Sequence, residues 1–130
     1  MNAAATTPTV LVADDEADVR ELVRLYLELE GFHVVDEATD GEQAIQRFLA
    51  LDPPPVPSVV VLDNQMPRLT GIEAAERILQ SHPDQVIVLF SAFLDDALTL
   101  RAHQAGVARC VSKLEAPDLP RKLREVLSGR

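Results

Sequence analysis

The chain has 130 residues, a formal net charge of −9, 47% hydrophobic residues and 25% charged residues, a composition typical of one globular domain. This acidic balance argues against direct nucleic-acid binding, which requires a basic face that neutralises phosphates. The apolar runs are too short for a membrane span, and the N-terminus lacks signal-peptide features. The single cysteine, Cys110, excludes an internal disulfide framework. We therefore expect a cytoplasmic location and no membrane contact.

Short β-branched runs alternate with stretches of helical periodicity along the chain. The first run is Thr9–Ala13, and the apolar positions from Val19 to Leu29 then recur at helical spacing up to Gly31. Further strands are predicted over 32–35, 58–62, 86–90 and 109–112. Further helices are predicted over 41–51, 71–80 and 95–105, with a last one that begins near Asp118 and has Pro120 in its first turn.

The pattern amounts to five units of strand followed by helix. Such units predict an α/β fold with a doubly wound parallel sheet and helices on both faces. The proline-rich stretch 52–57 is predicted to be a stiff connector. We expect one domain over 9–127, between short tails at 1–8 and 128–130. In sheets of this kind, ligands bind at the carboxyl ends of the strands.

Polar side chains are concentrated where the predicted strands end. Three acids follow the first strand, one acid follows the third, a hydroxyl follows the fourth and an ammonium group follows the fifth. These residues are, in that order, Asp14, Asp15 and Glu16, then Asp63, then Ser91, then Lys113. Singly, each residue has an ordinary explanation as a helix cap, a turn or a surface charge. Together, at one edge of a parallel sheet, they predict a functional site.

The chemistry of this group favours phosphoryl transfer with a divalent cation. Two carboxylates about 4 Å apart repel by roughly 4 kcal/mol at an effective dielectric constant of 20. Mg²⁺ would relieve this repulsion, because it prefers hard oxygen ligands and often binds carboxylates together with a phosphate. Asp63 would then act as a nucleophile beside a metal, a hydroxyl and a cation, and an acyl phosphate would be the product.

Four motifs in chain order resemble the receiver domains of two-component response regulators, the chemotaxis-regulator-like family. They are residues 11–16 (LVADDE), 63–67 (DNQMP) with Gly71 four residues later, 91–92 (SA) and 111–113 (VSK). The resemblance covers about residues 9–127. It implies a flavodoxin-like domain with five parallel strands in the order 2-1-3-4-5.

The resemblance also implies a phosphorylation site with its metal. By position, Asp63 is the expected phosphoacceptor and Asp15 a direct ligand of Mg²⁺ or Mn²⁺. Asp14 is expected to reach the metal through water, and the backbone carbonyl of Gln65 completes the protein ligands together with Asp63. Ser91 is expected to move toward the phosphoryl group.

The remaining implied roles concern partners and output. Lys113 is expected to pair with the phosphoryl group, which would come from a sensor histidine kinase, a phosphotransfer protein or a small phosphodonor. Phosphorylation is expected to shift the surface formed by the fourth helix, fifth strand and fifth helix. That surface would act on a downstream protein or on an output domain beyond this sequence. The chain is expected to be a phosphoacceptor that assists its own phosphorylation, and not an enzyme.

Two positions depart from the family pattern. Cys110 stands where the family often has an aromatic switch residue, and Leu114 stands where a cis-proline often follows the lysine. A large rotating ring therefore cannot report the state of the hydroxyl. Either Cys110 takes part in the switch in another way, or Phe90, Phe93 or the backbone carries the signal.

Several alternatives remain open from the sequence. The departure at Cys110 is compatible with a phosphorylation-independent interaction module of the same fold. An aspartate-nucleophile phosphatase is disfavoured, because Gln65 stands where that class has a second aspartate. The chain could be a complete regulator or the receiver of a longer protein. Residues 66–130 hold 8 acids and 9 bases, so this near-neutral half is a candidate surface for a phosphorylation-dependent homodimer.

Overall fold

A computed structural model describes residues 7–51 and 56–129 of the chain. Strands and helices alternate along it as the sequence predicts. In chain order the elements are β1 (Thr9–Ala13), α1 (Ala17–Leu29), β2 (His33–Ala38), α2 (Gly41–Ala50), β3 (Val59–Leu62), α3 (Gly71–Ser81), β4 (Ile87–Ser91), α4 (Asp96–Ala105), β5 (Arg109–Ser112), the 3₁₀ helix η1 (Lys113–Asp118) and α5 (Leu119–Ser128).

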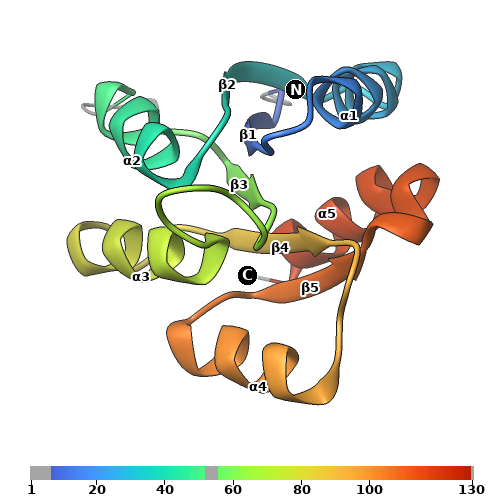
Figure 1. The fold of residues 1–130 in the computed structure, drawn as a ribbon. Helices are drawn as coiled ribbons and strands as arrows, with labels where there is room; N and C mark the ends of the chain where they lie inside the picture. The colour runs from blue at the N-terminus through green and yellow to red at the C-terminus, as the bar shows by residue number, and fades with distance from the viewer. Residues whose placement is uncertain (1–6, 52–55, 130) are drawn as a thin grey trace.

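The five strands form one parallel sheet in the order β2-β1-β3-β4-β5, which confirms the predicted topology. Helices α1 and α5 cover one face of the sheet, and α2, α3 and α4 cover the other (Figure 1). All five carboxyl ends of the strands therefore lie along the same edge. Within the described residues, no helix is long and apolar enough to cross a membrane.

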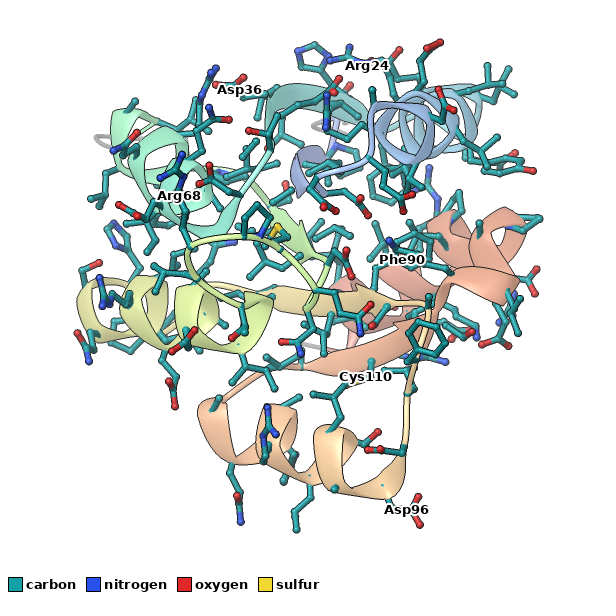
Figure 2. The ribbon with its side chains drawn as sticks, viewed as in Figure 1. Arg24, Asp36, Arg68, Phe90, Asp96 and Cys110 are labelled. Atoms are coloured by element: carbon teal, nitrogen blue, oxygen red, sulfur yellow. The ribbon has the colours of Figure 1, made fainter. Side chains whose placement is uncertain are left out.

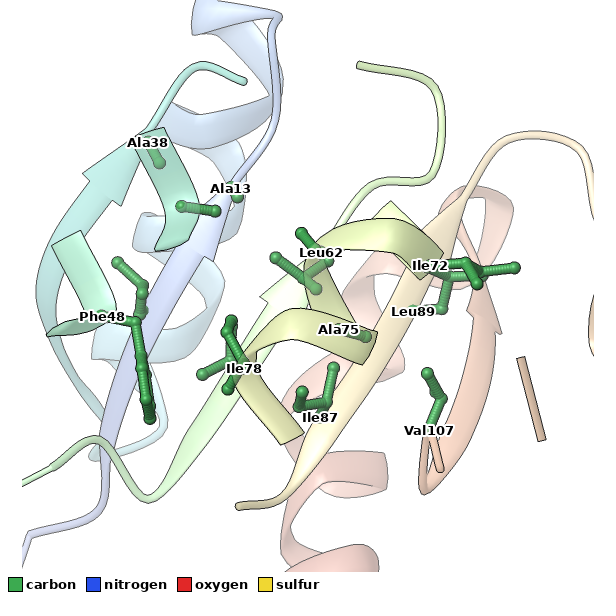
Figure 3. Packing of buried hydrophobic residues seen from close by; sticks show 14 of the residues in the cluster. Ala13, Ala38, Phe48, Leu62, Ile72, Ala75, Ile78, Ile87, Leu89 and Val107 are labelled. Carbon is green, nitrogen blue, oxygen red and sulfur yellow. The ribbon is translucent and has the colours of Figure 1, made fainter. Parts of the chain in front are cut away.

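Each face of the sheet has its own hydrophobic core, because alternate residues of a strand point to opposite faces. On one side, Leu62 packs with Phe48 of α2 and Ile78 of α3 (Figure 3), and Leu11 belongs to the same cluster. On the other side, valines from all five strands pack against α1 and α5, with Leu27 and Leu123 among the fully buried residues. Burial on both faces explains the continuous apolar runs in the central strands.

The second strand differs from its prediction. It was expected over 32–35 but continues to Ala38, through the charged residues Asp36 and Glu37. These acids are tolerated because β2 is an edge strand and both form ion pairs with arginines of α1 or α2. The register against β1 shifts by one residue between Val10 and Leu11, a bulge that the hydrophobic pattern does not reveal.

The chain between β5 and α5 also differs from its prediction. It forms the 3₁₀ helix η1, which the sequence analysis did not anticipate, with the Ser112 hydroxyl accepting a hydrogen bond from the Leu114 amide at 3.1 Å. The predicted start of the last helix is confirmed, since Asp118 precedes α5 and Pro120 lies in its first turn. Residues 52–55 of the predicted connector and 1–6 of the predicted tail lie outside the described residues.

The segment between β3 and α3 is held tightly against the end of β3. The Asn64 carbonyl accepts hydrogen bonds from the amides of Met66 and Gly71, and the Asn64 side chain accepts one from the Ile72 amide. Gly71 lies so close to this turn that an added Cβ atom would be 2.4 Å from the backbone carbonyl oxygen of Asp63. The absence of a side chain at this position therefore fixes where α3 begins relative to the end of β3.

We expect Gly71→Ala to lower the free energy of unfolding by about 1 to 3 kcal/mol, the usual range for overpacking. Gly129→Ala is the matched control, because its Cβ would make ordinary contacts, the nearest at 3.4 Å from the Glu125 carbonyl oxygen. Urea unfolding followed by circular dichroism measures both variants. Equal stability of the two variants would contradict the close approach at Gly71.

Candidate functional site

The carboxyl edge of the sheet brings two buried carboxylates to one ammonium group. Asp14 follows β1 and is 2% exposed, and Asp63 follows β3 and is 4% exposed. Lys113 follows β5, and its Nζ lies 2.7 Å from Asp14 Oδ2 and 3.2 Å from Asp63 Oδ2. Three residues separated by up to 99 positions thus meet at one point, because the strand order places β1, β3 and β5 at the same edge.

Backbone hydrogen bonds that continue the sheet hold both carboxylates in place. The Asp14 amide donates to the Ala38 carbonyl at 3.0 Å, and the Asp63 amide donates to the Ala13 carbonyl at 2.9 Å. The side chains are also held locally, since Asp14 Oδ1 accepts from the Glu16 amide at 2.9 Å and Asp63 Oδ1 accepts from the Gln65 amide at 3.3 Å. The two carboxylates are therefore positioned by the sheet and by their own turns.

An acidic cluster surrounds Asp14. Carboxylate oxygens of Asp14, Asp15 and Glu16 lie within 4.8 Å of one another, with Asp14 buried and the other two exposed. This set offers hard oxygen donors on a partly open surface, which suits Mg²⁺ or Mn²⁺ with several retained waters. Asp63 is linked to the cluster through Lys113. The residues present therefore fit a divalent cation.

Burial and mutual repulsion shift the titration of this site. The pKa of Asp63 is raised, chiefly by burial and further by the charge of Asp14, although Lys113 opposes the shift. Burial alone would lower the pKa of Lys113, but its hydrogen bond to Asp14 and the charge of Asp63 outweigh burial and raise it. One ammonium group is thus firmly charged between two carboxylates that it does not fully compensate.

Ser91 lies at the same edge but makes no hydrogen bond through its hydroxyl to any described residue, although it is fully buried. It was predicted to follow the fourth strand but is the last residue of β4, where it pairs with Ser112. Alternation along β4 places Ser91 on the face of Leu89, the face against which Cys110 also packs. Phe90 is buried on the opposite face, and Phe93 is 70% exposed.

Three contacts near the site were not predicted from the sequence. Glu16 belongs to the acidic cluster but was not among the expected metal ligands. Arg20 of α1 donates a hydrogen bond to the Asp14 carbonyl at 2.7 Å. Lys122 of α5 is buried and pairs with Glu115 of η1 at 2.9 Å, which ties the segment after Lys113 to α5. The position of Arg20 five residues after Asp15, on the first helix, is the one sequence signal that could have indicated its contact.

Comparison with known families agrees with this geometry. The sequence model of the family described as "Response regulator receiver domain" matches residues 10–124. The chain belongs to this family. The fold and the recognised motifs of the receiver domain are therefore those expected from the sequence.

Individual relatives show how far the similarity of this receiver domain extends. A protein-glutamate methylesterase/protein-glutamine glutaminase from Geobacter metallireducens is 35% identical over 92% of this chain but only 34% of its own length. The chemotaxis protein CheY of Thermotoga maritima is 30% identical over 92% of this chain and 93% of its own length. The receiver domain of the NarL response regulator from Mycobacterium tuberculosis superimposes with a TM-score of 0.86 at 29% identity, covering 97% of this chain and 100% of that one.

The curated relatives differ in length more than in this domain. The chain spans about one third to just over one half of the first four relatives, and nearly all of the Thermotoga protein. The receiver domain is thus shared by proteins of different length. Its function is therefore argued from the geometry of this domain and not from the rest of those proteins.

The raised pKa of Asp63 predicts a pH-dependent stability of the metal-free protein. The folded state holds the Asp63 proton more readily than the unfolded state does. The stability linked to this proton is therefore lost as the pH rises from about 3.9, the ordinary carboxyl value, through the raised folded pKa. At pH 7.5, Asp63→Asn should have a larger free energy of unfolding than the native chain, and the gain should shrink as the pH falls through that window.

Urea unfolding at several pH values, with a chelator present, measures this difference. Asp118→Asn is the control, because its carboxylate is exposed and makes no capping hydrogen bond to α5. An Asp63→Asn chain less stable than the native one at pH 7.5 would contradict the net cost of the Asp63 charge.

Proposed function

We propose that this receiver domain accepts a phosphoryl group on Asp63 in a reaction that depends on Mg²⁺, and that the phosphorylated form controls a protein partner or an output domain. The observation that carries the proposal is the Lys113 ammonium group 3.2 Å from the buried Asp63 carboxylate, beside the acidic cluster. A structural ion pair alone does not account for the three carboxylates of the acidic cluster and for a buried hydroxyl at the same edge that has no hydrogen-bond partner among the described residues.

The proposed reaction is a direct displacement. A carboxylate oxygen of Asp63 attacks the phosphorus of a phosphohistidine on a sensor kinase or phosphotransfer protein, the phosphorus–nitrogen bond breaks, and its electron pair stays on the histidine nitrogen. The product is an acyl phosphate on Asp63. Lys113 is close enough to stabilise charge that develops on the transferred group.

Asp14, Asp15 and Asp63, with the Gln65 backbone carbonyl, are the proposed ligands of the metal, and Glu16 lies beside them. A bound Mg²⁺ supplies positive charge that neutralises the carboxylates and the phosphoryl oxygens. The turn that joins Gln65 to Asp63 by a 3.3 Å hydrogen bond keeps the carbonyl-bearing segment next to the nucleophile.

Ser91 is the proposed sensor of the phosphoryl group. Its buried hydroxyl lacks a hydrogen-bond partner within the described residues, so an oxygen acceptor brought to this edge would satisfy it. A shift of Ser91 would act on the segment that leads to α4 and on the face that it shares with Cys110. The output is then the surface of α4, β5 and α5, without an aromatic ring at position 110.

A phosphorylation-independent interaction module remains the second candidate. The specific observation that favours it is Cys110, a small half-buried residue that packs into the core and cannot rotate as a large ring would. The relatives that are much longer than this chain leave open whether its partner is a separate protein or a linked domain. Dependence of partner binding on phosphorylation separates the two candidates.

We expect a single phosphoryl adduct when the chain is incubated with a small phosphodonor and Mg²⁺. Intact-mass spectrometry should detect the adduct, hydroxylamine should remove it, and a chelator should prevent it. Asp63→Asn should abolish it, because a neutral amide replaces the nucleophilic carboxylate.

Asp118→Asn, at an exposed carboxylate distant in sequence from the cluster, is the matched control and should be labelled as the native chain is. An adduct that persists in Asp63→Asn would place the nucleophile elsewhere. No adduct with a small donor or with a phosphorylated histidine protein would favour the interaction module.

We also expect phosphorylation to promote a homodimer through residues 66–130. This half holds 8 acids and 9 bases, so two copies meet there with little net repulsion. Light scattering should show a doubled mass for the phosphorylated native chain and a monomeric mass for Asp63→Asn under the same conditions. A monomeric mass with and without the phosphoryl group would rule out this assembly.

A further inference from the structure

The structure assigns Arg20 the role of a positioning residue for the acidic cluster. Arg20 lies in α1, and its side chain is 16% exposed. Its Nη1 donates a hydrogen bond to the backbone carbonyl oxygen of Asp14 at 2.7 Å, and its Nε donates to Glu37 Oε1 of β2 at 3.1 Å. The guanidinium therefore links the first helix, the edge strand and the acidic turn.

The Asp14 carbonyl belongs to the peptide unit that joins Asp14 to Asp15. Its orientation helps set the directions in which both side chains leave the backbone. The Asp14 amide is already fixed by its 3.0 Å hydrogen bond to the Ala38 carbonyl of β2. Arg20 holds the other end of the residue, so the turn that presents the acidic oxygens is fixed on both sides of Asp14.

The charge of Arg20 is balanced locally, although it lies close to the proposed cation site. Glu37 accepts a hydrogen bond from Arg20 through Oε1 and one from Nε of Arg24 through Oε2 at 2.8 Å, and Nη2 of Arg24 lies 2.7 Å from that same Oε2. Figure 2 shows Arg24 and Asp36 beside the ribbon of the edge strand β2. Because Glu37 compensates the guanidinium, the main effect of Arg20 on the cluster is orientation and not repulsion of a cation.

Arg24 provides a matched control within the same network. It shares Glu37 with Arg20 and lies one helical turn later in α1, but its hydrogen bonds and ion pairs are with Glu37 and Glu28. Removing Arg24 takes away a positive charge and an ion pair at Glu37 while the Arg20 contact with the Asp14 carbonyl stays. A difference between the two variants therefore isolates that carbonyl contact.

The inference rests on the proposed function only through the identity of the cation, Mg²⁺. Loss of a residue that orients metal ligands typically weakens metal affinity about 10- to 100-fold. We expect Arg20→Ala to raise the Mg²⁺ dissociation constant of the full chain by at least about tenfold, and Arg24→Ala by less than about threefold. Arg20→Lys should restore part of the affinity, because an ammonium group can also donate to a carbonyl.

The experiment combines two measurements on the full chain. Isothermal titration with MgCl₂ gives the dissociation constants. Amide hydrogen exchange in metal-free buffer reports on the Glu16 amide, which donates to Asp14 Oδ1 at 2.9 Å in the turn under test. That amide should exchange at least about fivefold faster in Arg20→Ala than in Arg24→Ala, because the turn opens more often without the hydrogen bond from Arg20 to the Asp14 carbonyl.

The outcomes are distinct for the two proposals. If the native chain binds no Mg²⁺, the proposed function loses its metal, while the exchange rate of the Glu16 amide still decides the role of Arg20. Equal exchange and equal Mg²⁺ affinity in the Arg20 and Arg24 variants, or tighter binding in Arg20→Ala, would overturn that role. Should Arg20→Ala fail to fold, Arg20→Met, which keeps most of the side-chain length but has no hydrogen-bond donor, decides by the same two readouts.

Discussion

Repulsion between two buried carboxylates at the carboxyl edge of the sheet is the constraint on which the site depends. Asp14 and Asp63 are both almost fully buried, and unpaired charges in such positions are costly. Lys113 compensates them from the end of β5, with contacts of 2.7 and 3.2 Å. The fold must therefore place the Lys113 ammonium group, from the second half of the chain, between two acids from the first half.

The contacts around the site position the two acids and the lysine. Backbone hydrogen bonds to β2 and β1 fix the two acids, and the bare backbone of Gly71 lets α3 begin against the end of β3. Lys113 is the first residue of η1, and the ion pair between Glu115 and Lys122 anchors that segment to α5. Leu114, at the position of the expected proline, is 90% exposed, so the segment is held by hydrogen bonds and charge instead of by a proline ring.

Much of this arrangement could be predicted from the sequence, because it follows from short-range patterns. The apolar runs predicted the strands, and the helical connections predicted parallel strands whose carboxyl ends share one edge. The strand order followed from the resemblance of the motifs to a family. The continuation of β2 to Ala38 could not be predicted, since Asp36 and Glu37 are stabilised by arginines that are distant in the chain. The burial of Lys122 and the contact of Arg20 with the Asp14 carbonyl could not be predicted for the same reason, because each depends on a partner that only the fold brings close.

The imbalance of the site also gives it a physical reason to respond to phosphorylation. Both cores are packed by ordinary apolar contacts, whereas the carboxyl edge keeps a carboxyl of raised pKa, an incompletely compensated acidic cluster and a buried hydroxyl without a partner among the described residues. A cation relieves the first two, and a phosphoryl oxygen would supply an acceptor for Ser91. The groups that are least satisfied in the unmodified chain are thus the ones that metal and phosphoryl binding would satisfy. A change of state on metal and phosphoryl binding would therefore draw its free energy from one edge of an otherwise well-packed sheet.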